Sequence, residues 1–250
     1  MKPAYLNAVG LGRRSSGRWL VCDLHLALSP STLYYLVGRN GAGKTTLLRL
    51  LAGLLQPTSG TVTLCGRRIW RAGPNVLSNI GFAPADGGYY PNLTIRQNLE
   101  LSVSLSARPD MGRVDKVASL LGLRALMQRT AKSLSKGQKK RLAIGSAWVG
   151  NHVMLLFDEP YADLDVPGLQ AVQALIFDTV RKSEAIVLVA SALPPDHLSV
   201  ASTVGILEAG RLLEQRAFPE GFDQAVLRTW LQLVSPLRAG GGTDEIATQT

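Results

Sequence analysis

Cysteine is scarce in this sequence, and Cys22 and Cys65 are the only two among 250 residues. A disulfide framework needs several paired cysteines, and a structural zinc site needs cysteine and histidine ligands clustered at short spacing. Two distant cysteines provide neither, so both kinds of stabilisation are excluded. We predict that both cysteines are reduced and serve as packing residues.

Long hydrophobic runs are also lacking, although 46% of the residues are hydrophobic. A membrane-spanning helix needs about 20 consecutive apolar residues, and no stretch approaches that length. Residues 1–5 (MKPAY) do not open a signal peptide, which would join a basic start to an apolar segment. The sequence therefore predicts a soluble cytoplasmic protein, with a core large enough for one domain and a subdomain.

Acidic and aromatic residues are few as well. Lysine and arginine number 27 against 18 aspartate and glutamate, which gives a formal charge of +9, and aromatic residues make up 6%. A positive surface suits nucleic acid, anionic lipid or a polyanionic nucleotide. The basic residues are dispersed in short groups, so we expect no nucleic-acid partner. A solvated surface with a basic bias is the plainer alternative.

The sequence does contain a phosphate-loop pattern. Residues 38–45 read Gly-Arg-Asn-Gly-Ala-Gly-Lys-Thr and fit G-x-x-x-x-G-K-[ST]. Strand-like residues 34–37 precede this loop, and a leucine-rich helical pattern follows it as far as residues 53–57. Inward backbone N–H groups and the positive end of the helix dipole would attract anions. The alternative, a chance glycine-rich turn, does not account for this strand–loop–helix context.

The pattern gives each loop residue a role. Lys44 is expected to reach the β- and γ-phosphates and to act in catalysis, Thr45 to bind Mg²⁺, and Thr46 to contact the α-phosphate. The predicted nucleotide contacts in the loop are Gly38, Asn40, Gly41, Ala42, Gly43, Lys44, Thr45 and Thr46.

Two later stretches complete the predicted site. Residues 153–157 are apolar, as is typical of a buried parallel strand, and Asp158 and Glu159 follow them directly. We predict that Asp158 holds Mg²⁺ and that Glu159 is the general base for an attacking water. Residues 134–138 open a helix whose first turn could bind a γ-phosphate, with a plain N-capped helix as the alternative. The predicted contacts there are Ser135, Gly137 and Gln138.

The remaining patterns predict a mixed α/β chain without internal repeats. Apolar alternation suggests antiparallel strands at residues 5–9, 19–28, 33–37, 61–64 and 80–83. Helical patterns and one further buried parallel strand follow. The helical patterns fall at residues 99–105, 114–121, 142–149, 169–180 and 227–234, and the strand at 186–190. Residues 238–250 are rich in Gly, Thr and acidic residues and are predicted to be a flexible tail.

Taken in order, these motifs resemble those of the nucleotide-binding subunits of ATP-binding cassette (ABC) transporters. The likeness covers about residues 5–215, and its motifs are Walker A at 38–45, the signature at 134–138, Walker B at 153–159 and the D-loop at 161–165. It implies an α/β fold, a P-loop NTPase of ABC type: a RecA-like mixed sheet core with an N-terminal antiparallel β subdomain and an inserted α-helical subdomain. The implied boundaries are 1–237 for the ATPase domain, about 86–150 for the helical subdomain and 238–250 for the tail.

The resemblance also implies cofactors and partners. Such subunits bind ATP and Mg²⁺ and pair head to tail, so that Walker A of one and Ser135 of the other enclose ATP in a homo- or heterodimer. An integral membrane permease would be the second partner, which implies a peripheral location on the cytoplasmic face of the inner or plasma membrane. Residues 80–99 and the Ser-Lys-Gly signature look most like exporters of the ABC-2 type.

Three positions depart from the family pattern. The family usually has a glutamine where this chain has Ala85, and a histidine where it has Ala192. It also stacks adenine on an aromatic residue, where this chain has Ser15. Trp19 is the nearest candidate for stacking, and a core position is the alternative for it.

These features lead to two main hypotheses. The first is an ATPase subunit that drives a membrane exporter, with residues 86–93 as the surface that meets the permease through Tyr89, Tyr90 and Leu93. The second is an ATP-binding regulatory subunit of a heteromeric complex, with slow or absent hydrolysis. A soluble ABC protein that acts on ribosomes or DNA is disfavoured, because such proteins usually carry two cassettes or a long coiled coil.

Overall fold

The computed structural model describes residues 5–192, 197–198, 202–219, 222–223, 225–227 and 229–230. The predicted tail at residues 238–250 and the last part of the predicted helix at 227–234 lie outside these residues. Residues 225–227 and 229–230 are helical.

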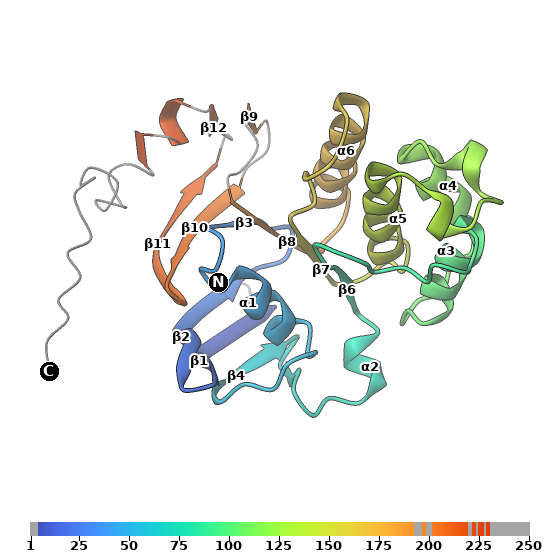
Figure 1. The fold of residues 1–250 in the computed structure, drawn as a ribbon. Helices are drawn as coiled ribbons and strands as arrows, with labels where there is room; N and C mark the ends of the chain where they lie inside the picture. The colour runs from blue at the N-terminus through green and yellow to red at the C-terminus, as the bar shows by residue number, and fades with distance from the viewer. Residues whose placement is uncertain are drawn as a thin grey trace, which may run out of the picture.

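A six-stranded sheet forms the centre of the molecule (Figure 1). From β10 to β6 the strands run parallel, and β11 is antiparallel to β10. Three of the parallel strands are fully buried along their length, because helices or the second sheet cover both faces. The order is β11 (Arg211–Phe218), β10 (Ser202–Glu208), β3 (Leu33–Val37), β8 (Ile186–Ser191), β7 (Met154–Asp158) and β6 (Ile80–Ala83).

A second sheet is built from the N-terminal part of the chain and is antiparallel throughout. Buried and exposed residues alternate along much of its strands, as expected where one face meets the core and the other meets water. Its order is β2 (Arg18–Leu28), β1 (Leu6–Ser15), β4 (Ser59–Leu64) and β5 (Arg67–Arg68). Helix α1 (Lys44–Leu51) lies between the two sheets and packs its leucines into their shared core.

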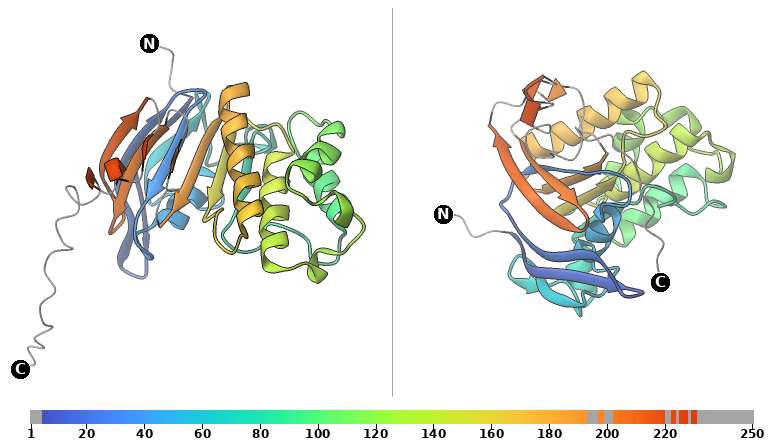
Figure 2. Two further views of the ribbon diagram at one scale, coloured as in Figure 1. Left: turned by 90° about the horizontal axis from the view of Figure 1, so that it is seen from above. Right: turned by 60° about the vertical axis from the view of Figure 1, so that its left-hand side comes forward.

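The helices of the middle of the chain stand to one side of the sheets, as the left view of Figure 2 shows. Helix α5 packs against β6 and β7, and α6 packs against both α5 and β8. These helices are α3 (Ile95–Ser104), α4 (Gly112–Leu120), the short η1 (Arg124–Leu126) and η2 (Ala131–Ser133), α5 (Lys136–Trp148) and α6 (Val166–Lys182). The remaining elements are α2 (Pro74–Leu77) and the paired short strands β9 (His197–Leu198) and β12 (Phe222–Asp223).

The structure confirms the predicted α/β class, the N-terminal antiparallel sheet and the helical segments that became α3, α4, α5 and α6. Two strand predictions are wrong in direction. Residues 33–37 and 80–83 were expected to be antiparallel, but β3 and β6 pair in parallel with their neighbours in the central sheet. Cys65 is exposed, so it is not the packing residue that we predicted. In the part of the chain that the structure describes, no helix is both long and apolar enough to cross a bilayer.

Candidate functional site

The phosphate loop (residues 38–45) joins the carboxyl end of β3 to the start of α1. The backbone at Gly43 requires glycine, because its φ is +106° and a Cβ there would lie 2.3 Å from the carbonyl oxygen of Leu20 on β2. Within the loop, the backbone N–H of Ala42 donates to the oxygen of Arg39 at 3.1 Å. The sequence therefore folds into a tight turn that ends directly in a helix N-terminus, which is where phosphate groups bind.

Lys44 lies inside this turn. Its side chain is buried, and Nζ donates to the carbonyl oxygens of Gly38, at 2.7 Å, and Arg39, at 3.3 Å. The same nitrogen is 3.4 Å from Oε1 of Glu159. The structure thus brings together the predicted phosphate-binding lysine and the predicted general base, although 115 positions separate them in the sequence.

Thr45 and Asp158 form the second pair of the site. The Thr45 hydroxyl donates to Oδ2 of Asp158 at 2.8 Å, and Asp158 is only 1% exposed. Burial raises the pKa of the Asp158 carboxyl, and the charge of Glu159 adds to this rise. The bond from Thr45 and the charges of Lys44 and Lys140 oppose it.

The other carboxylate oxygen of Asp158, Oδ1, is buried without a hydrogen-bond partner among the described residues. A buried anionic oxygen in that condition is costly unless a cation or a donor reaches it. Hydroxyl and carboxylate oxygens are the ligands that Mg²⁺ prefers. The Thr45–Asp158 pair therefore fits the metal that the sequence predicts.

Glu159 is held by the end of the neighbouring strand β8. Its backbone has a φ of +46°, in the left-handed region that glutamate rarely adopts, and its N–H donates to the carbonyl oxygen of Ala190 at 2.8 Å. Its Oε2 accepts from the Ser191 hydroxyl at 3.1 Å and from the backbone N–H of Ala192 at 3.4 Å. These bonds fix one carboxylate oxygen and leave the other facing Lys44.

Sequence reasoning overlooked Ser191, since it treated this end of β8 only as the place where a histidine is missing. The signal that could have found it was the same as for Asp158, a polar residue at the carboxyl end of a fully apolar strand. The N–H of Ala192 could not have been found, because backbone groups leave no trace in the sequence.

The predicted signature residues begin helix α5. Ser135 is its N-cap and accepts from the backbone N–H of Gln138, while the Gln138 side chain accepts from the N–H of Ser135. This capping box is the plain alternative that the sequence left open, and the serine hydroxyl keeps its own proton for a further partner. A Cβ at Gly137 would lie 2.9 Å from the carbonyl oxygen of Asp163, so the D-loop packs directly on this turn. Among the described residues, no hydrogen bond or ion pair connects the turn with the phosphate loop of the same chain.

The structure also shows the surroundings of Trp19, the candidate for adenine stacking, and of Ala85, one of the three departing positions. Trp19 is 43% exposed on β2, so the core alternative for it is wrong. It directly precedes Leu20, whose carbonyl touches the phosphate loop at Gly43. The carbonyl oxygen of Ala85, after β6, accepts a hydrogen bond from Nζ of Lys140 on α5.

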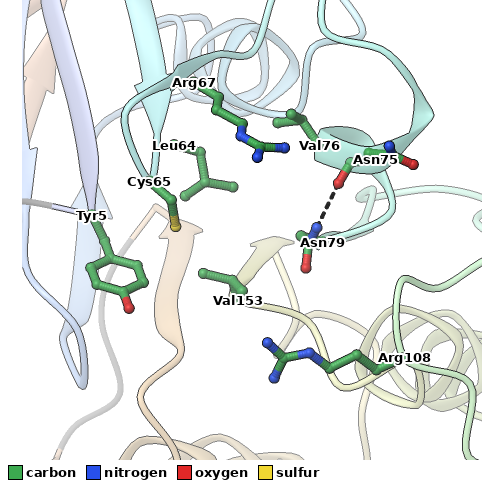
Figure 3. A pocket seen from close by; sticks show the side chains of 9 residues that line it. All are labelled: Tyr5, Leu64, Cys65, Arg67, Asn75, Val76, Asn79, Arg108 and Val153. Carbon is green, nitrogen blue, oxygen red and sulfur yellow. Dashed lines mark hydrogen bonds between the residues drawn. The ribbon is translucent and has the colours of Figure 1, made fainter.

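A pocket of about 330 Å³ lies elsewhere in the molecule (Figure 3). Asn79 and Val153 in its wall precede β6 and β7, so the pocket lies at the amino ends of these strands. Asp158 and Glu159 of the candidate site lie at the opposite, carboxyl end of β7. None of the predicted site residues lines the pocket. Its walls consist of Tyr5, Leu64, Cys65, Arg67, Asn75, Val76, Asn79, Arg108 and Val153.

Comparison with known families identifies the family of the chain. The model of the family described as "ABC transporter" matches residues 21–162, which is more than half of the 250-residue chain. The chain belongs to the ABC transporter family. It is an ATP-binding subunit of that family, as its curated relatives are named, so the family recognised from the motifs is confirmed.

The curated relatives of this ABC subunit differ in what they are named for. This chain is 29% identical to the uncharacterized ABC transporter ATP-binding protein YcbN of Bacillus subtilis (strain 168), over 91% of this chain and 73% of YcbN. It is 31% identical to the bacitracin transport ATP-binding protein BcrA of Bacillus licheniformis, over 79% of this chain and 65% of BcrA. It is 30% identical to the molybdenum import ATP-binding protein ModC of Yersinia pestis, over 86% of this chain and 61% of ModC. The chain thus spans only about two thirds of the length of these relatives.

Solved structures confirm the fold of an ABC cassette. One described as the ATP-binding subunit of an ABC transporter superposes with a TM-score of 0.77 at 20% identity, covering 91% of this chain and 99% of that one. The dimeric post-hydrolysis state of the ATP-binding cassette MJ0796, bound to ADP and Pi, superposes with a TM-score of 0.76 at 18% identity, covering 85% and 98%. The predicted fold class, a P-loop NTPase of ABC type, is therefore correct.

Proposed function

We propose that this ABC subunit binds ATP with Mg²⁺ and hydrolyses it to drive a membrane permease. One observation carries the proposal: Lys44, Thr45, Asp158 and Glu159 converge, with Lys44 Nζ at 3.4 Å from Glu159 and Thr45 Oγ1 at 2.8 Å from Asp158. Thr45 and Asp158 would hold Mg²⁺, whose charge offsets that of the phosphates. Lys44 would move from the loop carbonyls to the β- and γ-phosphates, and Glu159 would accept a proton from the attacking water.

The proposed nucleotide contacts centre on the phosphate loop. The loop residues proposed to contact nucleotide are Gly38, Asn40, Gly41, Ala42, Gly43, Lys44, Thr45 and Thr46. The exposed indole of Trp19 is proposed to stack on adenine, since it lies one residue from the contact between β2 and the loop.

The second half of the site is proposed to come from another subunit. Ser135, Gly137 and Gln138 are not joined to their own phosphate loop by any hydrogen bond among the described residues, and Ser135 is exposed. An ATP molecule enclosed between this turn and the loop of a second ABC subunit would use both. The proposed ATPase domain is residues 1–237, with the helical subdomain at about 86–150 and the tail at 238–250.

A permease is proposed to dock near residues 86–93, which places the subunit at the cytoplasmic face of the membrane. Tyr90 there is 59% exposed, whereas Tyr89 is half-buried against the helical core, so Tyr90 is the stronger candidate for the contact. Export by an ABC-2 type transporter is proposed on the sequence resemblance alone. Import is the alternative, because relatives named for import match comparably well.

Measurement of binding and turnover on one sample tests the proposal. Purified wild-type chain is titrated with ATP in Mg²⁺ and assayed for phosphate release, beside Lys44→Ala and Glu159→Gln. We expect Lys44→Ala to lose binding, and Glu159→Gln to keep binding while turnover falls about 10²–10³-fold. Binding that survives Lys44→Ala unchanged would contradict the assignment of the loop.

A second candidate function is an ATP-binding regulatory subunit with impaired hydrolysis. The observation that favours it is that Ala85 and Ala192 offer no side-chain donor at the nucleotide edge. In that case the wild-type chain would bind ATP without turnover, and Glu159→Gln would leave the transport activity of the assembled complex unchanged. Loss of transport in Glu159→Gln would instead support the ATPase.

A further inference from the structure

Lys140 is a buried lysine that the nucleotide-binding scheme above does not use. It lies in the second turn of α5 and is 9% exposed. Its Nζ donates to the carbonyl oxygen of Ala85, just beyond β6, and so ties α5 to the end of a strand of the central sheet. Among the described residues it has no direct ion pair, and its nearest charged surroundings are acids at longer range.

Four carboxylates act on the charge of this ammonium group, and strand pairing brings two of them close to the carbonyl that it binds. Ala83, two residues before Ala85, pairs with Phe157, which Asp158 and Glu159 follow directly. Burial lowers the pKa of Lys140, and all four carboxylates oppose that change, so each is close enough to act on its charge. They come from three segments: the residue after Ala85, the end of β7 and the D-loop. They are Asp86, Asp158, Glu159 and Asp163.

A bond to one carbonyl does not explain why a charged side chain is present. Burying an ammonium group is unfavourable, and an uncharged donor such as glutamine could make the same hydrogen bond without burying a charge. A lysine is favoured only where nearby negative charge repays its burial. Lys44 balances the acids from the side of the phosphate loop, and Lys140 balances them from the side of α5.

We propose that Lys140 is a positioning residue of the nucleotide site: it is the resident counter-cation of the acids at the ends of β6 and β7, and it holds the loop after β6 to α5 until a divalent cation binds. The inference rests on the proposed function, because the divalent cation is the one that accompanies ATP. Lys140 is not proposed to touch the nucleotide.

The charge of Lys140 gives the proposal a direction. A divalent cation at Thr45 and Asp158 is repelled by the ammonium group, so removal of that charge should tighten metal binding. Coupling between two binding events is reciprocal, so bound metal must weaken the attraction between Lys140 and the acids by the same factor. Occupation of the acids would then be felt by α5, whose first turn carries Ser135.

The first experiment needs no nucleotide. Urea unfolding of the full chain is measured for wild type, Lys140→Met, Asp158→Asn and the double variant. Lys140 offsets the charge of Asp158, so the effect of Lys140→Met should depend on whether that charge is present. We expect Lys140→Met to raise the equilibrium constant for unfolding at least about 3-fold more in the wild-type background than in the Asp158→Asn background. Lys139→Met is the matched control, with the same charge change one residue away, and should show no such coupling. Lys140→Gln, which keeps a donor for Ala85 without the charge, should behave as Lys140→Met.

The second experiment measures the metal. With a non-hydrolysable ATP analogue at a fixed saturating concentration, Mg²⁺ is titrated from zero and the change in tryptophan fluorescence is followed. We expect half-saturation of Lys140→Met and Lys140→Gln at about 3-fold lower Mg²⁺ than wild type, since one nearby unit charge is removed. Lys139→Met should match wild type.

The outcomes are separable. The proposal would be overturned if the effects of Lys140→Met and Asp158→Asn on unfolding simply added, or if the Lys140 variants reached half-saturation at the same Mg²⁺ concentration as wild type. Lys140 would then serve only to bind the carbonyl of Ala85. Failure of the wild-type chain to bind the analogue would instead contradict the proposed function, while the unfolding cycle would still decide the role of Lys140.

Discussion

At the scale of single residues, the orientation of the proposed general base, Glu159, depends on the neighbouring groups that bind its carboxylate. Glu159 adopts a left-handed backbone conformation, which costs of order 1 kcal/mol or more and persists only when the surroundings enforce it. Ser191 and the N–H of Ala192 hold one carboxylate oxygen, and Lys44 faces the other. The direction of the free oxygen is therefore set by β8 as much as by Glu159 itself.

Ser191→Ala tests this arrangement. Loss of the hydroxyl frees the carboxylate to rotate, so we expect turnover of ATP to fall about 5- to 20-fold while the dissociation constant for ATP changes less than about 2-fold. Steady-state kinetics with Mg²⁺ in excess gives both values. Ser146→Ala, which removes another buried serine hydroxyl, on α5, is the control. A parallel loss of ATP binding would show that Ser191 supports the fold of the site rather than the orientation of the base.

Trp19→Ala tests the proposed adenine contact. Stacking of a base on an aromatic ring contributes about 1–3 kcal/mol, so the dissociation constant for ATP should rise about 5- to 150-fold, with turnover at saturation little changed. Trp19→Phe should keep most of the affinity. Tyr90→Ala removes another exposed aromatic residue, distant in sequence from the loop, and should bind ATP as wild type does. Equal affinity in Trp19→Ala and wild type would assign adenine to another partner.

At the scale of elements, an arginine on α4 binds the end of α5. Arg113 on α4 donates from Nε to the carbonyl oxygen of Val149 at 2.8 Å and from Nη2 to that of Trp148 at 3.1 Å. Its guanidinium carbon also lies 4.1 Å from the centre of the Trp148 ring. Burial lowers the pKa of Arg113, and Asp110 opposes this change. The arginine thus satisfies the free carbonyl groups at the end of α5, where a cation also suits the helix dipole.

We expect Arg113→Ala to lower the free energy of unfolding by about 2–3 kcal/mol, because two carbonyl bonds and the ring contact are lost together. Arg113→Lys should recover little, since an ammonium group cannot reproduce the planar fork. Urea unfolding measures both. Arg124→Ala, at an exposed arginine near the same helices, should change the free energy by less than about 0.5 kcal/mol. If Arg113→Ala also lowered the free energy of unfolding by less than about 0.5 kcal/mol, water would be binding the two carbonyl groups as well as the arginine does.

The elements also show what the sequence could predict. The phosphate loop and the acids after β7 were predictable, because each depends on a contiguous stretch with a fixed pattern. The direction of β3 and β6 was not, because an apolar strand looks the same whichever way its neighbours run. Parallel pairing there follows from the crossover helices, which are remote in sequence. Ser191 and Lys140 escaped prediction for the same reason, since their partners come from other segments.

At the scale of the whole molecule, the two ends of the central strands differ in chemistry. The charged site residues lie at the carboxyl ends, whereas a half-buried histidine lies at the amino ends of β6 and β7. His152 precedes β7, and its Nδ1 lies 3.0 Å from the carbonyl oxygen of Ser78, close to the start of β6. Burial is the main cause that lowers the pKa of His152 to about 4; the Ser78 bond opposes it and the charge of Arg113 assists it.

This low pKa makes the stability of the whole fold depend on pH. The unfolded chain binds a proton at His152 below about pH 6.5, while the folded chain resists it until about pH 4. Between these values the unfolded state holds more protons, so stability falls as the pH falls. The contribution of His152 is fully present above about pH 7, and up to about 3 kcal/mol is lost by pH 4.

His152→Asn isolates this contribution, since the amide can still donate to the carbonyl of Ser78 but does not titrate. We expect the free energy of unfolding of wild type to drop by about 2 kcal/mol more than that of His152→Asn between pH 7 and pH 5, measured by urea unfolding in one buffer series. The carboxylates titrate in both proteins, so their contribution to the pH dependence cancels in the difference between the two free energies of unfolding. His25→Asn, at an exposed histidine, is the control and should follow wild type. Identical pH slopes for wild type and His152→Asn would show that the half-buried imidazole accepts a proton in the folded state as readily as in the unfolded one.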